Sequence, residues 1–144
     1  MIILCTFVVI FMQVVPQHQA EQIAKVAVKL FFQITDQWQL TEKQKLVLAG
    51  LNSRTTFHTW REKLEQNKPI KLSRDTLERF SYIAGIYKAL QLLFPMENQW
   101  QQWVHKPNRD FNGQSALDRM LGGNVLDLAD IRRYLDAHRG SHFE

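Results

Sequence analysis

Apolar residues in the last third of the chain recur at the spacing of two short amphipathic helices. Before the pair Gly122 and Gly123, the apolar positions are Leu117, Met120 and Leu121, an i, i+3, i+4 pattern. After the pair, they are Val125, Leu128, Ile131 and Leu135. Helices this short are unstable alone in water. We therefore expect both to pack on each other, on the rest of the chain or on a partner.

Helical signals also cover the first half of the chain. A capping box at Thr41 and Gln44 predicts a helix from there to about residue 50, and Ser53 is a natural N-cap for a helix to about residue 66. Residues 20–38 have an amphipathic helical period, with apolar positions at Ile23, Val26, Ala27, Leu30, Ile34 and Trp38.

Two more helices are expected in the middle of the chain. Ser73 can cap a long helix over residues 74–94, and a short one is expected over 95–105, ended by the Lys-Pro-Asn sequence that follows. No segment has the alternating pattern of a strand. The predicted fold class is therefore all-α.

Residues 1–15 form an almost unbroken apolar run, MIILCTFVVIFMQVV. The run is shorter than the roughly 18 apolar residues that a membrane span needs, and it lacks the basic start and cleavage site of a secretory signal. Three interpretations stay open: an upstream artefact with translation starting at Met12, burial in a dimer or core contact, and a membrane or export role. Cys5 in this run is the only cysteine, which excludes a disulfide framework within one chain.

The net charge of +4 is concentrated in one part of the chain. Residues 41–70 hold six basic and three acidic side chains, whereas residues 106–144 hold six of each. A local basic excess is the electrostatic footprint expected of a nucleic-acid-binding segment, although a solvated helical face has the same composition.

The two helices expected within residues 41–66 have the layout of a helix-turn-helix unit. In the second helix Phe57, Trp60 and Leu64 should face the core, which leaves polar residues near its N-terminus free to enter a DNA groove. Lys45 and Lys63 are expected to contact the phosphate backbone. The candidate DNA-binding residues are Lys43, Ser53, Arg54, Thr55, Thr56, His58, Thr59 and Arg61. The alternative is a helical hairpin whose polar face is only solvated.

Five segments of the chain form a recognisable set: SRTTFHTWREKL at 53–64, LERFSYIAGIYKALQLLF at 77–94, WVHKPN at 103–108, FNG at 111–113 and IRRYLDAHRG at 131–140. Through these segments the chain from about residue 40 to residue 140 resembles the MbcA/ParS/Xre antitoxin family. One departure is Ala116, where relatives usually carry Pro just inside a helix.

The resemblance implies an Xre-like helix-turn-helix subdomain followed by a small C-terminal helical toxin-binding subdomain. With the apolar start, the expected divisions are residues 1–19, 20–72 and 73–144. The family implies a type II antitoxin that occludes the active site of a RES-domain, NAD-consuming toxin. It also implies repression of its own operon at operator DNA, as a homodimer within a larger cytoplasmic complex. A stand-alone regulator with a C-terminal dimerisation domain is the alternative.

The residues that match the family's toxin-binding part are Arg132, Arg133, Tyr134, Leu135, His138, Arg139, Gly140, His142 and Phe143. Guanidinium groups there could hold acidic groups of the toxin, and aromatic side chains could anchor the interface. The same residues have structural alternatives, because Tyr134 and Leu135 suit a core position and the two arginines have acidic neighbours on the helix.

Catalytic and metal-binding constellations are not apparent in the sequence. There is no glycine-rich phosphate loop, no serine-centred elbow and no Cys–His pair. His138 and His142 have the i, i+4 spacing of a metal pair, but Gly140 between them is expected to end the helix. We therefore expect no enzymatic activity, no metal, no cofactor and no small-molecule substrate.

Overall fold

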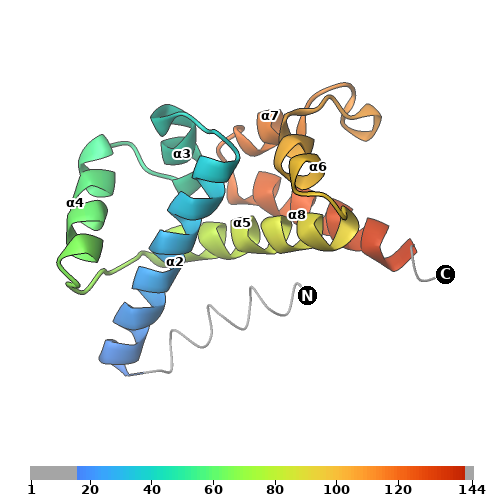
Figure 1. The fold of residues 1–144 in the computed structure, drawn as a ribbon. Coiled ribbons are helices and arrows are strands. Elements are labelled where there is room, and N and C mark those ends of the chain that lie inside the picture. The colour runs from blue at the N-terminus through green and yellow to red at the C-terminus, as the bar shows by residue number, and fades with distance from the viewer. Residues whose placement is uncertain (1–15, 142–144) are drawn as a thin grey trace.

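The computed structural model describes residues 16–141, and the described chain is an assembly of helices joined by short loops (Figure 1). Residues 1–15, His142 and Phe143 lie outside the described residues, and with them the expectations for the apolar start and for those two side chains. The elements are α2 (Gln17–Gln37), α3 (Glu42–Ala49), α4 (Arg54–Glu65), α5 (Arg74–Leu93), α6 (Glu97–Gln102), the 3-10 turns η1 (Trp103–His105) and η2 (Arg109–Phe111), α7 (Ala116–Met120) and α8 (Val125–Ser141). The predicted all-α class is confirmed.

The capping signals in the sequence start the helices where we expected them. Thr41 and Gln44 form the reciprocal hydrogen bonds of a capping box. Ser53 accepts a hydrogen bond from the backbone N–H of Thr55, and Ser73 accepts one from Thr76. One expected end is wrong: α8 continues through Gly140 to Ser141.

The long helix α5 is the centre of the fold. It packs against α2 and α3 on one side and against α8 on the other (Figure 1). Aromatic rings from three helices fill the first of these contacts. The Phe31 and Phe80 rings are stacked with centroids 4.3 Å apart, and Phe57 and Trp60 of α4 lie against them. This cluster fixes α4 to the rest of the molecule through its predicted core face.

Two buried arginines lie at the packing of α5 and α8, and one of them links the two halves of the chain. Arg79 of α5 donates hydrogen bonds to Asp75, at 2.9 Å, and to the carbonyl oxygen of Gly123 in the loop before α8, also at 2.9 Å. Arg132 of α8 is 3% exposed and is one of the few charged side chains buried in the described chain. It pairs with Asp136 one turn later.

Candidate functional site

A sharp turn joins α3 and α4 and sets the angle between them. Gly50 ends α3 in the left-handed conformation, with φ of 72°. A side chain at this position would be strained, and its Cβ would lie 2.7 Å from the Arg79 side chain. Ser53 then starts α4 at the surface. The result is a helix-turn-helix pair whose second helix presents its N-terminus to solvent.

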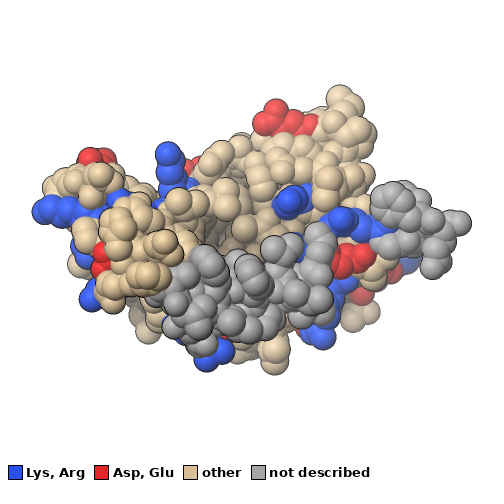
Figure 2. Space-filling view, turned by 90° about the horizontal axis from the view of Figure 1, so that it is seen from below, with Lys and Arg blue, Asp and Glu red and all other residues tan. Residues whose placement is uncertain are grey.

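The outward face of α4 carries most of the predicted DNA-binding residues. Exposed side chains are Lys43 of α3 and Ser53, Arg54, Thr55 and His58 of α4, whereas Thr56 and Thr59 are half-buried. Phe57 and Trp60 are buried and Leu64 packs against the core, as predicted. In Figure 2, basic side chains lie at the end of the molecule that α4 forms and also elsewhere on the same face. Arg54 makes no ion pair within the described chain, so its guanidinium is available to a ligand.

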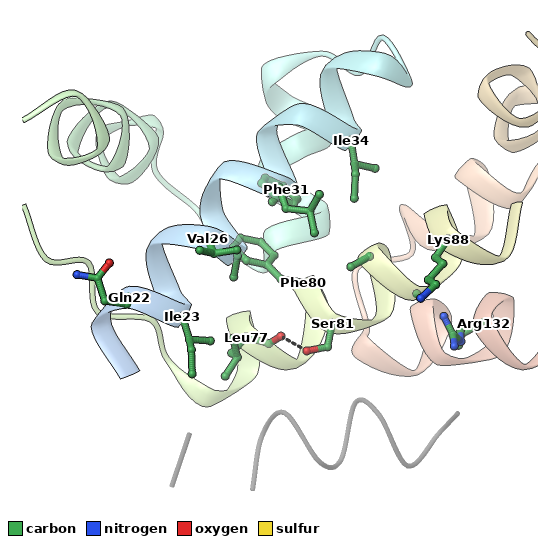
Figure 3. Close-up of a pocket in the computed structure, with 14 residues that line it drawn as sticks. Gln22, Ile23, Val26, Phe31, Ile34, Leu77, Phe80, Ser81, Lys88 and Arg132 are labelled. Atoms are coloured by element: carbon green, nitrogen blue, oxygen red, sulfur yellow. Dashed lines mark hydrogen bonds between the residues drawn. The ribbon is translucent and has the colours of Figure 1, made fainter. Parts of the chain in front are cut away.

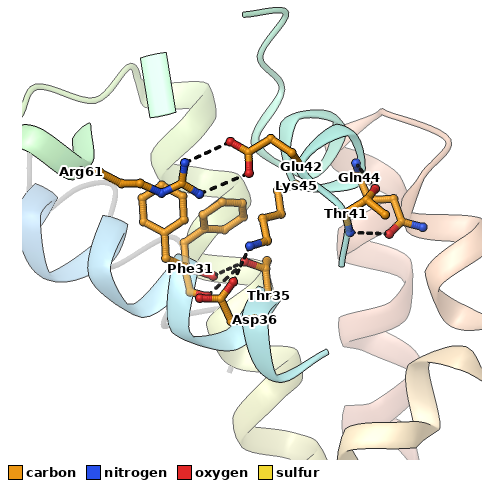
Figure 4. A network of polar contacts seen from close by, with 9 residues as sticks. Phe31, Thr35, Asp36, Thr41, Glu42, Gln44, Lys45 and Arg61 are labelled. Atoms are coloured by element: carbon orange, nitrogen blue, oxygen red, sulfur yellow. Dashed lines mark hydrogen bonds and ion pairs between the residues drawn. The ribbon is translucent and has the colours of Figure 1, made fainter. Parts of the chain in front are cut away.

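Arg61 differs from the other predicted DNA contacts, because it holds α4 against α3. Its two terminal nitrogens donate to both carboxylate oxygens of Glu42, at 3.0 and 3.2 Å (Figure 4). Its guanidinium lies 4.5 Å from the centre of the Phe32 ring. The hydrogen bonds from Arg61 lower the pKa of the Glu42 carboxyl below its ordinary value, against the opposing effect of burial. Arg61 therefore positions the helix that carries the exposed residues.

The expectation that Lys45 contacts the DNA backbone is wrong. Its side chain is buried and pairs with Asp36 at the end of α2 (Figure 4). The position of Lys45 on α3 directs its side chain toward α2, where the Asp36 carboxylate compensates the positive charge. Lys45 thus contributes to the packing of α3.

The predicted toxin-binding residues of α8 separate into a buried and an exposed set. Arg132 and Leu135 are 3% and 1% exposed and contact the protein's own core. Arg133 and His138 are exposed, and Arg139 is half-buried. The expected intrahelical pairs of both arginines are present, Arg132 with Asp136 and Arg133 with Asp130, the latter at 2.5 Å. A partner that approaches α8 thus meets the exposed set first.

Tyr134 lies between these sets and connects α8 to the loop before α7. Its hydroxyl donates to Asp110 at 2.8 Å and accepts from the Asn108 side chain at 3.3 Å. Its ring is 4.7 Å from that of Phe111 and 4.2 Å from that of His138. Burial raises the pKa of the Tyr134 hydroxyl, which keeps it protonated as a donor.

A small hollow beside Tyr134 includes residues that the sequence reasoning missed. Its volume is about 130 Å³. It is lined by the predicted residues Tyr134, Leu135 and His138 and by three residues that were not predicted, Leu93, Phe94 and Trp103. Next to it in the chain, Leu92 and Met96 are exposed at 59% and 58%. The sequence could have indicated this surface, because the segment Leu-Leu-Phe-Pro-Met is apolar on both sides of a proline that ends a helix. Exposed apolar side chains in such a segment are typical of a protein interface.

Comparisons with known proteins fit this two-part arrangement. Residues 17–85 match the antitoxin Xre-like helix-turn-helix domain, and residues 89–140 match the antitoxin Xre/MbcA/ParS C-terminal toxin-binding domain. The chain belongs to the Xre/MbcA/ParS antitoxin family. The two matched regions meet within α5, and the resemblance seen in the sequence is confirmed. This protein is therefore an antitoxin of a toxin–antitoxin system, with a toxin and DNA as its partners.

The antitoxin is also similar to the uncharacterized protein y4oB of Sinorhizobium fredii (strain NBRC 101917 / NGR234). The two are 43% identical over 110 residues, which cover 76% of this chain and 81% of the relative. Both domain families matched by the antitoxin are non-enzymatic. Within residues 16–141 no helix is long and apolar enough to cross a membrane, and no cluster of three metal-ligating side chains is present.

Proposed function

We propose that this antitoxin neutralises a RES-domain toxin by covering the toxin's NAD-binding site, and that it represses its own operon through α4. The single observation that carries the proposal is the placement of the two exposed surfaces. The N-terminal half of α4 and the C-terminal half of α8 lie at opposite ends of the molecule (Figure 1). An operator and a toxin can therefore be bound at the same time by one chain.

The toxin-binding part of the proposal rests on the exposed residues of α8 and the hollow beside them. Arg133, His138 and Arg139 would face acidic groups at the mouth of the toxin's site. The exposed apolar side chains of Leu92 and Met96, close in the chain to residues that line the hollow, would add buried area. Tyr134 and Trp103 would supply the aromatic anchors. Gly140, His142 and Phe143 belong to the same proposed surface by their position in the sequence.

The DNA-binding part rests on the exposed N-terminal half of α4. Arg54 would pair with a guanine or a phosphate, Thr55, Thr56 and Thr59 would contact bases or thymine methyl groups, and Ser53 and Lys43 would contact the backbone. The His58 ring lies 3.3 Å from the Glu62 carboxylate, so His58 would have to leave this carboxylate in order to contact DNA. A homodimer would place two such helices on a palindromic operator. Both partners would be met in the cytoplasm.

Co-expression with the product of the neighbouring gene tests this function. We expect the neighbour alone to arrest growth and deplete cellular NAD, and the antitoxin to restore both while forming a stable complex. A neighbour that is harmless and does not co-purify with this chain would contradict the toxin-binding part. In that case salt-dependent binding to the promoter DNA would favour a stand-alone regulator whose C-terminal domain serves for dimerisation.

A further inference from the structure

An apolar groove runs between α2 and α5. Its volume is about 520 Å³, several times that of the hollow beside Tyr134. Figure 3 shows Ile23, Val26 and Ile34 of α2 on one side and Leu77 and Phe80 of α5 on the other. The described lining also includes Gln22, Ala27, Leu30, Phe31, Ser81, Ala84, Gly85, Lys88 and Arg132.

The groove exists because α2 has apolar residues on more than one face. The face buried in the core is formed by Ala24, Val28 and Phe31, one step around the helix from the stripe noted in the sequence. The stripe from Ile23 to Ile34 lines the groove. Ile34 at its end is also buried in the core, whereas Val26 within it is 66% exposed. An apolar surface of this extent is unusual on a soluble protein unless something covers it.

Charge is scarce along the described lining. Lys88 and Arg132 are its only charged residues, and both lie at one end (Figure 3). Arg132 pairs with Asp136. The Ser81 hydroxyl donates to the carbonyl oxygen of Leu77 at 3.0 Å. The middle of the groove therefore suits an apolar occupant that carries no charge.

The chain itself contains a segment with these properties. Residues 1–15 have no charged side chain, and only Thr6 and Gln13 are polar. They connect through Pro16 to the first residue of α2, about one and a half turns before the groove begins at Gln22. The groove from Gln22 to Ile34 is roughly 18 Å long along α2, whereas 15 residues span about 22 Å as a helix and about 50 Å when extended. The segment can thus cover the groove's whole length.

We infer that residues 1–15 fold back at Pro16 and occupy the groove between α2 and α5. The covalent connection gives the segment an effective concentration of the order of millimolar at the groove, well above that of a second molecule at ordinary dilution. A dimer formed through the two grooves alone would leave both 15-residue segments exposed to water. The fold-back covers both apolar surfaces with one contact.

Cys5 allows a direct test on the full chain expressed from Met1. Val26→Cys places a second thiol in the groove, and Gln114→Cys places one on the exposed loop of the toxin-binding domain as a matched control. After treatment with a short bismaleimide we expect a cross-link between Cys5 and residue 26 within the monomer. It should form at least about tenfold faster than the control cross-link, because docking raises the effective concentration of Cys5 near residue 26 and not near residue 114.

Each other outcome overturns the inference. A cross-link between two chains would assign the groove to a second copy. Equal cross-linking rates for the two variants would mean that residues 1–15 do not favour the groove. Sedimentation of the full chain with phospholipid vesicles, without the internal cross-link, would assign the segment to a membrane surface.

A stability measurement gives an independent readout. Val26→Asp would introduce a charge beneath the docked segment. The control, Leu126→Asp, introduces the same charge outside the groove, at a residue of nearly equal exposure, 68%. We expect Val26→Asp to lower Tm by about 5 °C or more relative to Leu126→Asp. Equal Tm values would contradict the covered groove.

Discussion

Arg132 of α8 lies directly over Gly85 of α5, where only a glycine leaves room for it. A Cβ atom at residue 85 would be 1.8 Å from Nη1 of Arg132 and 2.6 Å from its Cζ. The guanidinium cannot move away at little cost, because it is buried and hydrogen-bonded to Asp136. This contact determines how closely α5 and α8 approach each other.

Gly85→Ala should therefore destabilise the protein, although alanine is the better helix residue by about 0.5–1 kcal/mol. We expect the free energy of unfolding, measured with urea, to fall by about 1–3 kcal/mol because of the steric conflict. In an Arg132→Ala background the same change should be neutral or stabilising. Equal losses in the two backgrounds would mean that Arg132 is not the cause.

Arg79 connects the helix-turn-helix to the toxin-binding domain, so its loss should weaken the whole fold. Arg79→Met removes charged hydrogen bonds to Asp75 and to the carbonyl oxygen of Gly123, and we expect a loss of about 2–3 kcal/mol in urea unfolding. Asp75→Asn is the control. It retains the link to Gly123, and because Asp75 is exposed it should cost less than about 1 kcal/mol. Similar costs for both would contradict a role for the Gly123 contact.

The pair between Glu42 and Arg61 predicts how stability depends on pH. The folded-state pKa of Glu42 is below that of the unfolded chain, so the carboxylate stabilises the fold above the unfolded value of about 4.3. This contribution is lost as the pH falls through the folded-state pKa. Glu42→Gln should therefore destabilise the protein at pH 7 and much less at pH 3. Glu65→Gln, at the exposed end of α4, is the control for the loss of a surface carboxylate. A loss of stability in Glu42→Gln that is the same at both pH values would contradict a stabilising pair between Glu42 and Arg61.

Arg54→Ala should weaken operator binding by about 10- to 100-fold at fixed salt without changing Tm, since Arg54 is exposed at the start of α4. Arg109→Ala makes the same charge change in the other domain and should leave DNA affinity nearly unchanged. Arg61→Ala should reduce both DNA affinity and Tm, because Arg61 holds α4 in place. Unaltered DNA binding by Arg54→Ala would exclude α4 as the reading helix.

Arg133→Glu should weaken toxin inhibition while leaving DNA binding intact, because Arg133 is exposed on α8 and faces away from the core. We expect at least about a tenfold loss in inhibition of the co-purified toxin, the size of one charge reversal in an interface. Arg74→Glu, exposed at the start of α5, is the control for the charge change. Equal effects of the two variants would indicate that only net charge matters.

Much of this architecture could be predicted from local signals in the sequence. Caps at Thr41, Ser53 and Ser73 depend on neighbours two or three residues away, so the pattern alone indicates them. The core face of α4 followed from its periodicity. Lys45 was misplaced because its burial depends on Asp36, which belongs to another helix. The end of α8 was misplaced because a glycine stops a helix only where no packing continues it.

The two proposed binding surfaces follow from the sequence less completely than the fold does. The exposed residues of α4 share one helix end, which spacing predicts. The hollow beside Tyr134 brings together α5, η1 and α8, and no local pattern indicates such a meeting. The burial of Arg132 likewise depends on Gly85, which is 47 positions earlier in the chain.

The central place of α5 limits how antitoxins of this kind can exchange parts. Its Arg79 and Gly85 lie within the region matched to the helix-turn-helix domain, yet both serve the packing of α8 and the loop before it. A chimaera joined between the two matched regions would cut one continuous helix and separate α8 from the surface that fits it. We therefore expect that recombination preserves both DNA binding and toxin binding when it occurs in the loop before Arg74. In that case α5 is inherited together with the toxin-binding domain. Toxin specificity would then evolve in one block that includes residues 74–85, the last part of the region matched to the helix-turn-helix domain.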